Sequence, residues 1–172
     1  MLMNLLSVAI VLLGTTLVVA SVRANFSAYL DEETQIKFVA AVIIHEAGGE
    51  GEEGMQLVAN CIQNRMYKHK TRWGFTPYEV VCKKGQFSCL RGVSDLHAFI
   101  DYAERGWPNQ WNLAVGMSKH LHEVLGGKAA YCTKLSGYPT HFYTAKTTIH
   151  VPNPQKFHHL GQVGHHNFFE EN

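Results

Sequence analysis

The chain has 172 residues, of which 46% are hydrophobic and 17% are charged. This length suits one domain with its own core, and the composition excludes a disordered or fibrous protein. The formal net charge of +1 lacks the cationic excess with which proteins bind nucleic acid, so nucleic acid is not expected as a partner.

The first 24 residues differ from the rest of the chain. Residues 5–22 contain no charged side chain, which fits a marginal membrane span or the apolar core of a signal peptide. The stretch SVRA, residues 21–24, offers small residues for cleavage, but no Lys or Arg precedes the apolar run. Two hypotheses remain, a cleaved signal peptide and an uncleaved hydrophobic helix that anchors the protein in the membrane. Both place the rest of the chain, residues 25–172, outside the cytoplasm.

Two helices are predicted next. The first covers residues 34–47, where an amphipathic stripe holds Ile36, Val39, Ala40 and Ile43, and residues 31–34 supply capping residues and early carboxylates at its start. The second covers residues 54–68, and its apolar stripe holds Met55, Val58, Ala59, Ile62 and Met66. We expect both stripes to face the core.

Glycines and a proline make residues 70–95 read as an irregular loop. Helices are predicted again at residues 94–105 and 111–127, the latter ended by two glycines. The tail carries two β-prone pieces, THFYTA at 140–145 and HNFFE at 166–170, around the connection VPNPQ. The pattern predicts a single, mainly helical α+β domain with a small β element.

The four cysteines suit a compartment in which disulfides persist. They allow three pairings, and a bridge between Cys82 and Cys89 would close a tight loop around KKGQFS. Cys61 lies on the apolar side of its helix, which also fits a buried thiol. No C-x-x-C motif occurs, which disfavours a zinc ribbon and a thioredoxin-type site.

The stretch HEAGGEGEEG starts like the H-E-x-x-H of a zinc protease. Gly49 stands where the second His would follow His45 by one turn, so two imidazoles cannot share a helix face there. Glu46 instead follows the apolar run AAVII at the end of a helix, where burial and the helix dipole disfavour the ionised carboxylate. A protonated carboxyl is what a general acid needs for glycoside cleavage, although capping or pairing with a cation is the alternative.

Four sequence blocks occur in order: HEAGGEGEEGMQLVANCIQNR at 45–65, GQFS at 85–88, THFYTA at 140–145 and GHHNFF at 164–169. This order resembles the SleB-type cell wall hydrolases, found among spore-cortex-lytic enzymes, bacterial envelope enzymes and phage lysis proteins. The resemblance implies a lysozyme-like domain, related to lytic transglycosylases, that cuts the glycan strands of peptidoglycan without a cofactor. The chain departs from the family at Gly48, where Arg is frequent, and in the turn at Gly51 and Glu52, which usually contains Pro.

The resemblance also implies roles for individual residues. Glu46 takes the place of the catalytic acid/base, and a supporting set braces it: Glu50, Asn64 and Arg65. The expected substrate-binding residues are Gln86, Phe87, Ser88, His141 and Tyr143. The rings of Phe87 and Phe142 either stack on sugars or fill the core. Because neither GQFS nor THFYTA supplies a second carboxylate, we favour a lytic transglycosylase, in which the sugar's own 6-hydroxyl attacks, over a muramidase that uses water.

A histidine cluster near the C-terminus comprises His158, His159, His165 and His166. Neighbouring side chains on a strand point to opposite faces and no zinc-type spacing is completed, so no metal site is expected. A structural hydrogen bond is expected for His165, whereas His141 would orient Glu46 or a substrate hydroxyl.

Two other functions are weighed against this one. The first is a non-catalytic glycan-binding or structural module of an envelope or virion, and the second is a zinc amidase or peptidase that uses the histidine-rich tail. Phage lysis, opening of the wall during infection and bacterial wall remodelling all remain as settings for an enzyme.

Overall fold

The computed structural model describes residues 30–68, 70–125, 127–144 and 155–172, and the chain divides into two units, Met1–Thr34 and Gln35–Asn172. In the described end of the first unit, the Asp31 carboxylate accepts hydrogen bonds from the Thr34 N–H and hydroxyl, each at 2.8 Å. These bonds cap the following helix as predicted. The predicted leader, residues 1–24, lies outside the described residues. No helix in the described part combines the length and apolar character that a membrane span requires.

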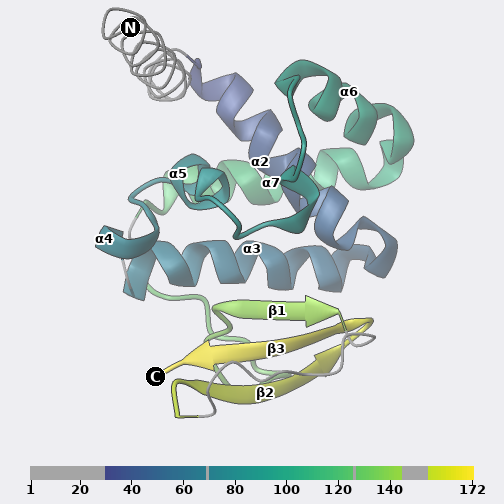
Figure 1. Ribbon diagram of the computed structural model, residues 1–172. Coiled ribbons are helices and arrows are strands. Elements are labelled where there is room, and N and C mark those ends of the chain that lie inside the picture. Colours follow the sequence, from purple (N-terminus) through teal and green to yellow (C-terminus); the bar gives the residue numbers. More distant parts are fainter. Residues whose placement is uncertain (1–29, 69, 126, 145–154) are drawn as a thin grey trace, which may run out of the picture. The chain divides into compact units, whose positions relative to one another are not determined.

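The elements follow one another along the chain, with two short 3₁₀ turns, η1 and η2, among them (Figure 1). The helical elements are α2 (Glu32–Ala47), η1 (Gly48–Glu50), α3 (Gly51–Lys68), α4 (Lys70–Trp73), α5 (Pro77–Cys82), η2 (Ser88–Leu90), α6 (Leu96–Gly106) and α7 (Pro108–Glu123). The strands are β1 (His141–Thr144), β2 (Phe157–Val163) and β3 (His166–Glu171). The α+β class and the predominance of helix are confirmed.

The three strands form one antiparallel sheet in the order β1-β3-β2. The hairpin between β2 and β3 turns at Gly164, whose φ of +56° favours glycine. Strand β2 was not predicted, because its sequence FHHLGQV lacks a run of β-branched residues and carries a glycine at an irregularity in the register. It pairs along the whole of β3, so the partner strand determines its conformation.

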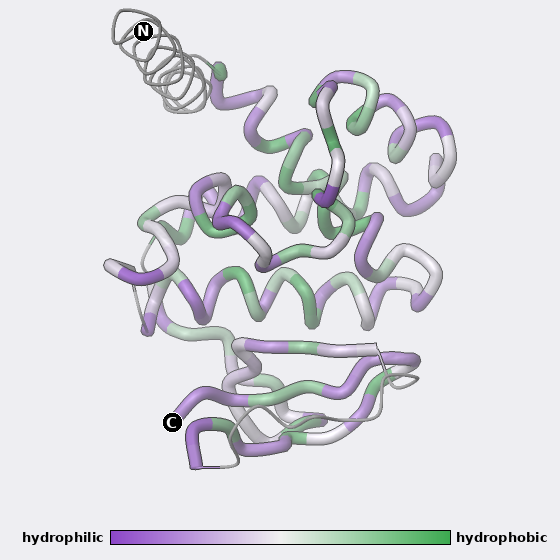
Figure 2. Tube along the Cα trace, viewed as in Figure 1, coloured by the Kyte–Doolittle hydropathy of each residue, from purple (hydrophilic) through white to green (hydrophobic). Residues whose placement is uncertain are grey.

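Helix α3 lies between the sheet and the other helices (Figure 1). Its predicted stripe is confirmed: Met55, Val58, Ala59, Ile62 and Met66 are all buried. A second side of α3 is buried as well, where Leu57 and Cys61 join Leu135, Val163 and Phe168 in a cluster beneath the sheet. Figure 2 shows the hydrophobic stretches along α2 and α3.

Helix α2 forms as predicted, but its apolar face is wider than the predicted stripe. Every residue from Phe38 to Ile44 is buried, so this part of the helix is enclosed on all sides. A helix enclosed in this way needs apolar residues around its whole circumference, which VAAVII provides. Its C-terminal residues therefore have a fixed position in the core.

Residues 70–95 contain more helix than predicted, namely α4, α5 and η2. Thr76 caps α5 by accepting the Glu79 N–H at 3.1 Å, and Pro77 occupies the first turn. Helix α7 starts at Pro108, earlier than predicted, and ends at Glu123, before the two glycines. The segment that follows α5 carries GQFS.

Candidate active site

Glu46 lies in the last turn of α2, and its side chain is half-buried. Its Oε1 accepts the backbone N–H of Cys89 at 3.0 Å and the hydroxyl of Ser88 at 3.4 Å. Both of these bonds end on Oε1, and the Cys89 thiol is a further hydrogen-bond partner of the carboxylate. The loop between α5 and α6 thus holds the carboxylate through Oε1.

Phe87 holds the loop between α5 and α6 in place through its buried ring. Its ring is 2% exposed and packs against Phe142 of β1, with ring centroids 6.2 Å apart. Ser88 on its other side is exposed, and Gln86 is half-buried. Of the two roles expected for Phe87, core filling agrees with this burial, since the ring has almost no surface on which a sugar could stack.

Arg65 connects α3, the loop and the start of β1. Its guanidinium carbon lies 5.0 Å from the Trp73 ring centroid and 5.2 Å from that of Phe87, and its Nε donates to the Thr140 carbonyl at 2.7 Å. Burial lowers the pKa of Arg65, while neighbouring acidic groups, among them Tyr143 and Glu46, oppose that shift. The buried guanidinium of Arg65 on α3 therefore interacts electrostatically with the Glu46 carboxylate on α2.

Asn64 fastens the segment before β1 to α3. Its Nδ2 donates to the carbonyls of Ala130 at 3.0 Å and Pro139 at 2.9 Å, and its Oδ1 accepts the Ala130 N–H at 2.7 Å. These three bonds use most of what one amide side chain offers. Asn64 and Arg65 are adjacent on α3 and both hold backbone of residues 139–140.

Glu50 ends η1 and locks the hairpin of the sheet to the helices. Its side chain is 8% exposed, and its Oε1 accepts the His165 N–H at 2.9 Å and lies 2.8 Å from His166 Nδ1. Glycines enclose the carboxylate on two sides: a Cβ on Gly54 or on Gly164 would approach its Oε2 to 2.9 Å. The second Glu of the block thus contacts the C-terminal block of the sequence.

Two residues of β1 were expected to bind substrate, and the structure places them differently. His141 is buried: its ring packs edge-on against Trp73 and Phe157, and its Nδ1 lies 3.0 Å from the Thr140 hydroxyl. Tyr143 is 42% exposed and rests its ring edge on Phe169. Of the two, only Tyr143 presents a surface to solvent.

Comparison with known protein families shows the family of the chain. Residues 49–169 match the family model described as Cell Wall Hydrolase. The chain belongs to the cell wall hydrolase family. The SleB-type resemblance read from the sequence blocks is thereby confirmed, and family membership implies that the substrate is peptidoglycan. The match includes Glu50, Asn64 and Arg65, and it starts three residues after Glu46. Neither the curated proteins nor the solved structures yielded a match.

Gly48, directly after the end of α2, has a tryptophan beside it. A Cβ on Gly48 would lie 3.2 Å from Ile44 Cγ2 and 3.5 Å from the Trp107 ring. The first atom of a side chain at this position would thus already contact the indole and crowd Ile44. Sequence reasoning missed the contact between Gly48 and Trp107, since the two residues lie 59 positions apart.

Several of the described histidines of the hydrolase contact other groups of the protein. His159 Nε2 lies 3.1 Å from Asn167 Oδ1, and His45 stacks on Phe99 at 4.2 Å between ring centroids. The backbone N–H of His165 donates to Glu50, whereas the imidazole that lies against Glu50 is that of His166. Within the described ranges, no three His, Cys, Asp or Glu side chains lie together as a metal site would require.

The Cys82–Cys89 disulfide considered from the spacing is not formed, because all four cysteines are free thiols. The two thiols have other partners: Cys82 hydrogen-bonds with Tyr78, and Cys89 with Glu46. Burial, and then the Glu46 carboxylate, raise the pKa of the Cys89 thiol. Burial raises the pKa of Cys61 to about 12, which agrees with its interpretation as a buried thiol. Sequence reasoning missed Cys89 as a partner of Glu46, although Cys89 directly follows the GQFS block.

Proposed function

We propose that this cell wall hydrolase family member cleaves the β-1,4 bond between N-acetylmuramic acid and N-acetylglucosamine, with Glu46 as general acid and then base. The observation that carries this proposal is the asymmetry of the Glu46 carboxylate: the Ser88 hydroxyl and the Cys89 N–H both donate to Oε1, and neither bonds Oε2. A proton on Oε2 would pass to the glycosidic oxygen as the bond breaks. The domain on which this takes place, residues 25–172, is proposed to be lysozyme-like.

The contacts of Glu50 favour a one-carboxylate mechanism. A retaining or inverting glycosidase places a second carboxylate near the acid, as nucleophile or base. Glu50, the carboxylate nearest in sequence, is buried against His165 and His166 and is committed to the hairpin. In a lytic transglycosylase the 6-hydroxyl of the muramic acid attacks C1 and gives its proton back to Glu46, so the product ends in a 1,6-anhydro ring. We favour this reaction.

The remaining residues divide into those that bind sugar and those that hold the site. Ser88, between α5 and α6, and Tyr143, on β1, are exposed, and Gln86 is half-buried. These three residues supply hydrogen bonds to hydroxyl or acetamido groups of the sugar. Phe87, Asn64 and Arg65 act as positioning residues, because their contacts join the loop, α3 and β1. Peptidoglycan lies outside the cytoplasmic membrane, so the enzyme acts there, delivered by a signal peptide or anchor in residues 1–24.

Mass spectrometry of the products from purified peptidoglycan tests the proposal. The full chain should release anhydro-muropeptides, and Glu46→Gln should release none while unfolding at the same denaturant concentration. Glu104→Gln, at an exposed position of α6, is the matched control and should retain full activity.

Each other outcome is informative. Products with reducing ends would replace the transglycosylase by a muramidase and require a second carboxylate. Full activity of Glu46→Gln would remove Glu46 from the chemistry. If the folded wild-type chain released nothing from several wall types, the non-catalytic glycan-binding module would take the place of the enzyme.

A further inference from the structure

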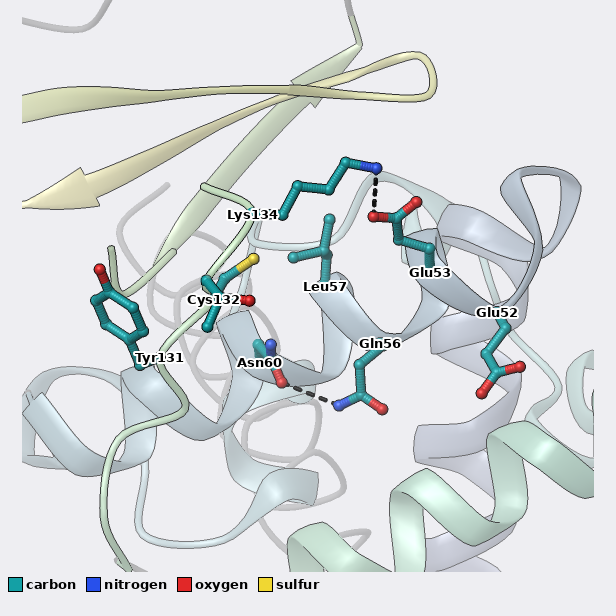
Figure 3. A pocket seen from close by; sticks show the side chains of 9 residues that line it. Glu52, Glu53, Gln56, Leu57, Asn60, Tyr131, Cys132 and Lys134 are labelled. Carbon is teal, nitrogen blue, oxygen red and sulfur yellow. Dashed lines mark hydrogen bonds and ion pairs between the residues drawn. The ribbon is translucent and has the colours of Figure 1, made fainter. Parts of the chain in front are cut away.

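A hollow of about 480 Å³ lies along α3 and the segment 131–134 that crosses it (Figure 3). Its lining includes Glu52, Glu53, Gln56, Asn60, Tyr131 and Lys134, and does not include Glu46, Ser88 or Cys89. Asn60 and Arg65 are five residues apart on α3, which separates their side chains by roughly 140° around the helix axis. The hollow is therefore on a different side of α3 from the residues around Glu46.

Two amide side chains in the hollow form an ordered pair. Gln56 Nε2 donates to Asn60 Oδ1 at 3.0 Å (Figure 3). This bond leaves the Gln56 Oε1 acceptor and the Asn60 Nδ2 donors without a partner among the described residues. The open acceptor on Gln56 and an open donor on Asn60 match the N–H and C=O of a secondary amide, such as the acetamido group of an amino sugar.

Tyr131 supplies an apolar surface at the rim of the same hollow. Its side chain is 50% exposed, and its orientation is fixed by an edge-on contact with Tyr138, with ring centroids 5.0 Å apart and planes at 72°. A held and partly exposed aromatic ring with a polar tip is suited to the C–H face of a pyranose. An aromatic ring beside open amide groups is the combination that an acetamido sugar requires.

The charges around the hollow favour a neutral ligand. Lys134 Nζ donates to Glu53 Oε1 at 2.6 Å, which satisfies the lysine of the lining. Glu52 adds a second carboxylate, so the three charged residues sum to −1. Phosphate polymers and the carboxylates of peptide stems would be repelled, whereas sugar hydroxyls donate hydrogen bonds to a carboxylate.

We propose that this hollow binds an N-acetylated amino sugar of the glycan strand, remote from the bond that is cut. The source of that sugar in peptidoglycan rests on the proposed function. Gln56 and Asn60 hold the acetamido group, Tyr131 packs against the ring, and Glu52 accepts from a hydroxyl. Such a remote site lowers KM for long strands without entering the chemistry, because it binds substrate and transition state equally.

Nuclear magnetic resonance of the full-length Glu46→Gln chain with the N-acetylglucosamine tetramer tests the site. The side-chain NH₂ signals of Gln56 and Asn60 should shift on titration. In Tyr131→Ala these shifts should need about tenfold more ligand, because a ring contact of this kind contributes on the order of a tenfold change in affinity. Tyr102→Ala, a tyrosine that is 68% exposed on α6, is the matched control and should titrate like its parent.

Two further ligands separate the possible sources of binding. The β-1,4-linked glucose tetramer is neutral and carries hydroxyls in place of the acetamido groups, so it should leave both NH₂ signals in place, as should a stem tetrapeptide. Equal shifts with the glucose tetramer, shifts with the peptide, or no shift with the acetylated sugar would each overturn the proposal. If Tyr131→Ala does not fold, Gln56→Leu at an exposed position replaces it, with the same loss expected.

The readout uses a chain that does not cleave, so it is independent of the catalytic proposal. If the Glu46→Gln chain binds the acetylated sugar and the wild-type chain does not cleave peptidoglycan, the proposed reaction is refuted and the proposed sugar site is retained. If the wild-type chain cleaves peptidoglycan and these shifts are absent, the sugar site is refuted and the proposed reaction is retained.

Discussion

Replacing Gly164 by alanine tests the contact that joins the sheet hairpin to Glu50. The backbone there has a φ of +56°, and for a residue with a side chain this left-handed conformation costs about 1–2 kcal/mol. The new Cβ would also lie 2.9 Å from Glu50 Cδ, so the buried carboxylate must move. Moving it sacrifices the bond from the His165 N–H, and a hydrogen bond to a charged group contributes about 1.5–3 kcal/mol. We expect the free energy of unfolding to fall by about 2.5–5 kcal/mol.

Gly92→Ala is the matched control, measured by urea unfolding beside Gly164→Ala. Gly92 has a φ of +78°, but a Cβ there would meet no atom within 4 Å, so only the backbone cost of about 1–2 kcal/mol applies. Adding Glu50→Ala to Gly164→Ala should relieve the clash, so the two losses should be less than additive. The reasoning is refuted if Gly164→Ala and Gly92→Ala are equally destabilised, or if the double variant shows strict additivity.

Three other expectations concern residues around Glu46. Cys89 should react slowly with iodoacetamide at pH 8, because its raised pKa leaves little thiolate. Glu46→Gln should speed the reaction by removing the neighbouring anion. Equal alkylation rates of Cys89 in the two proteins, measured by mass spectrometry, would contradict the contact between Cys89 and Glu46. Asn64→Leu should lower the free energy of unfolding by about 2–4 kcal/mol, because it leaves three backbone groups unpaired, whereas Gln63→Leu, which loses one exposed bond, should cost under about 1 kcal/mol; similar denaturant midpoints would argue against the clasp. His141→Ala removes a buried ring and should destabilise by about 1–3 kcal/mol, and kcat per folded molecule then decides whether His141 also acts on the substrate, since an unchanged kcat would leave it a purely structural role.

The sequence determined the four longer helices, two of the three strands and the candidate acid. The stripe of α3 is a periodic signal, and it forms as predicted because side chains three and four positions apart share a helix face. Glu46 at the end of an apolar helix, and the blocks shared with the cell wall hydrolases, were likewise legible from neighbouring residues. Such features depend on residues that are close together in the sequence, so they can be predicted without knowing how the helices and strands pack.

The tertiary structure decided the features that depend on distant partners. Strand β2 has a weak strand sequence and forms because β3 pairs with it along its length. Helix α2 looked amphipathic and is enclosed, because the packing of its neighbours, and not its own periodicity, sets how much of its surface is buried.

The surroundings of the two carboxylates show the same division. Glu46 meets Cys89 only because Phe87 docks the intervening loop against Phe142 and Arg65, and Glu50 meets His165 across 115 positions of sequence. Residue types and spacing do not predict these two long-range contacts, because the free energy that maintains them comes from side-chain packing throughout the domain. The sequence thus identified Glu46 as the candidate acid, together with many of its neighbours, and the fold determined which atoms hold it.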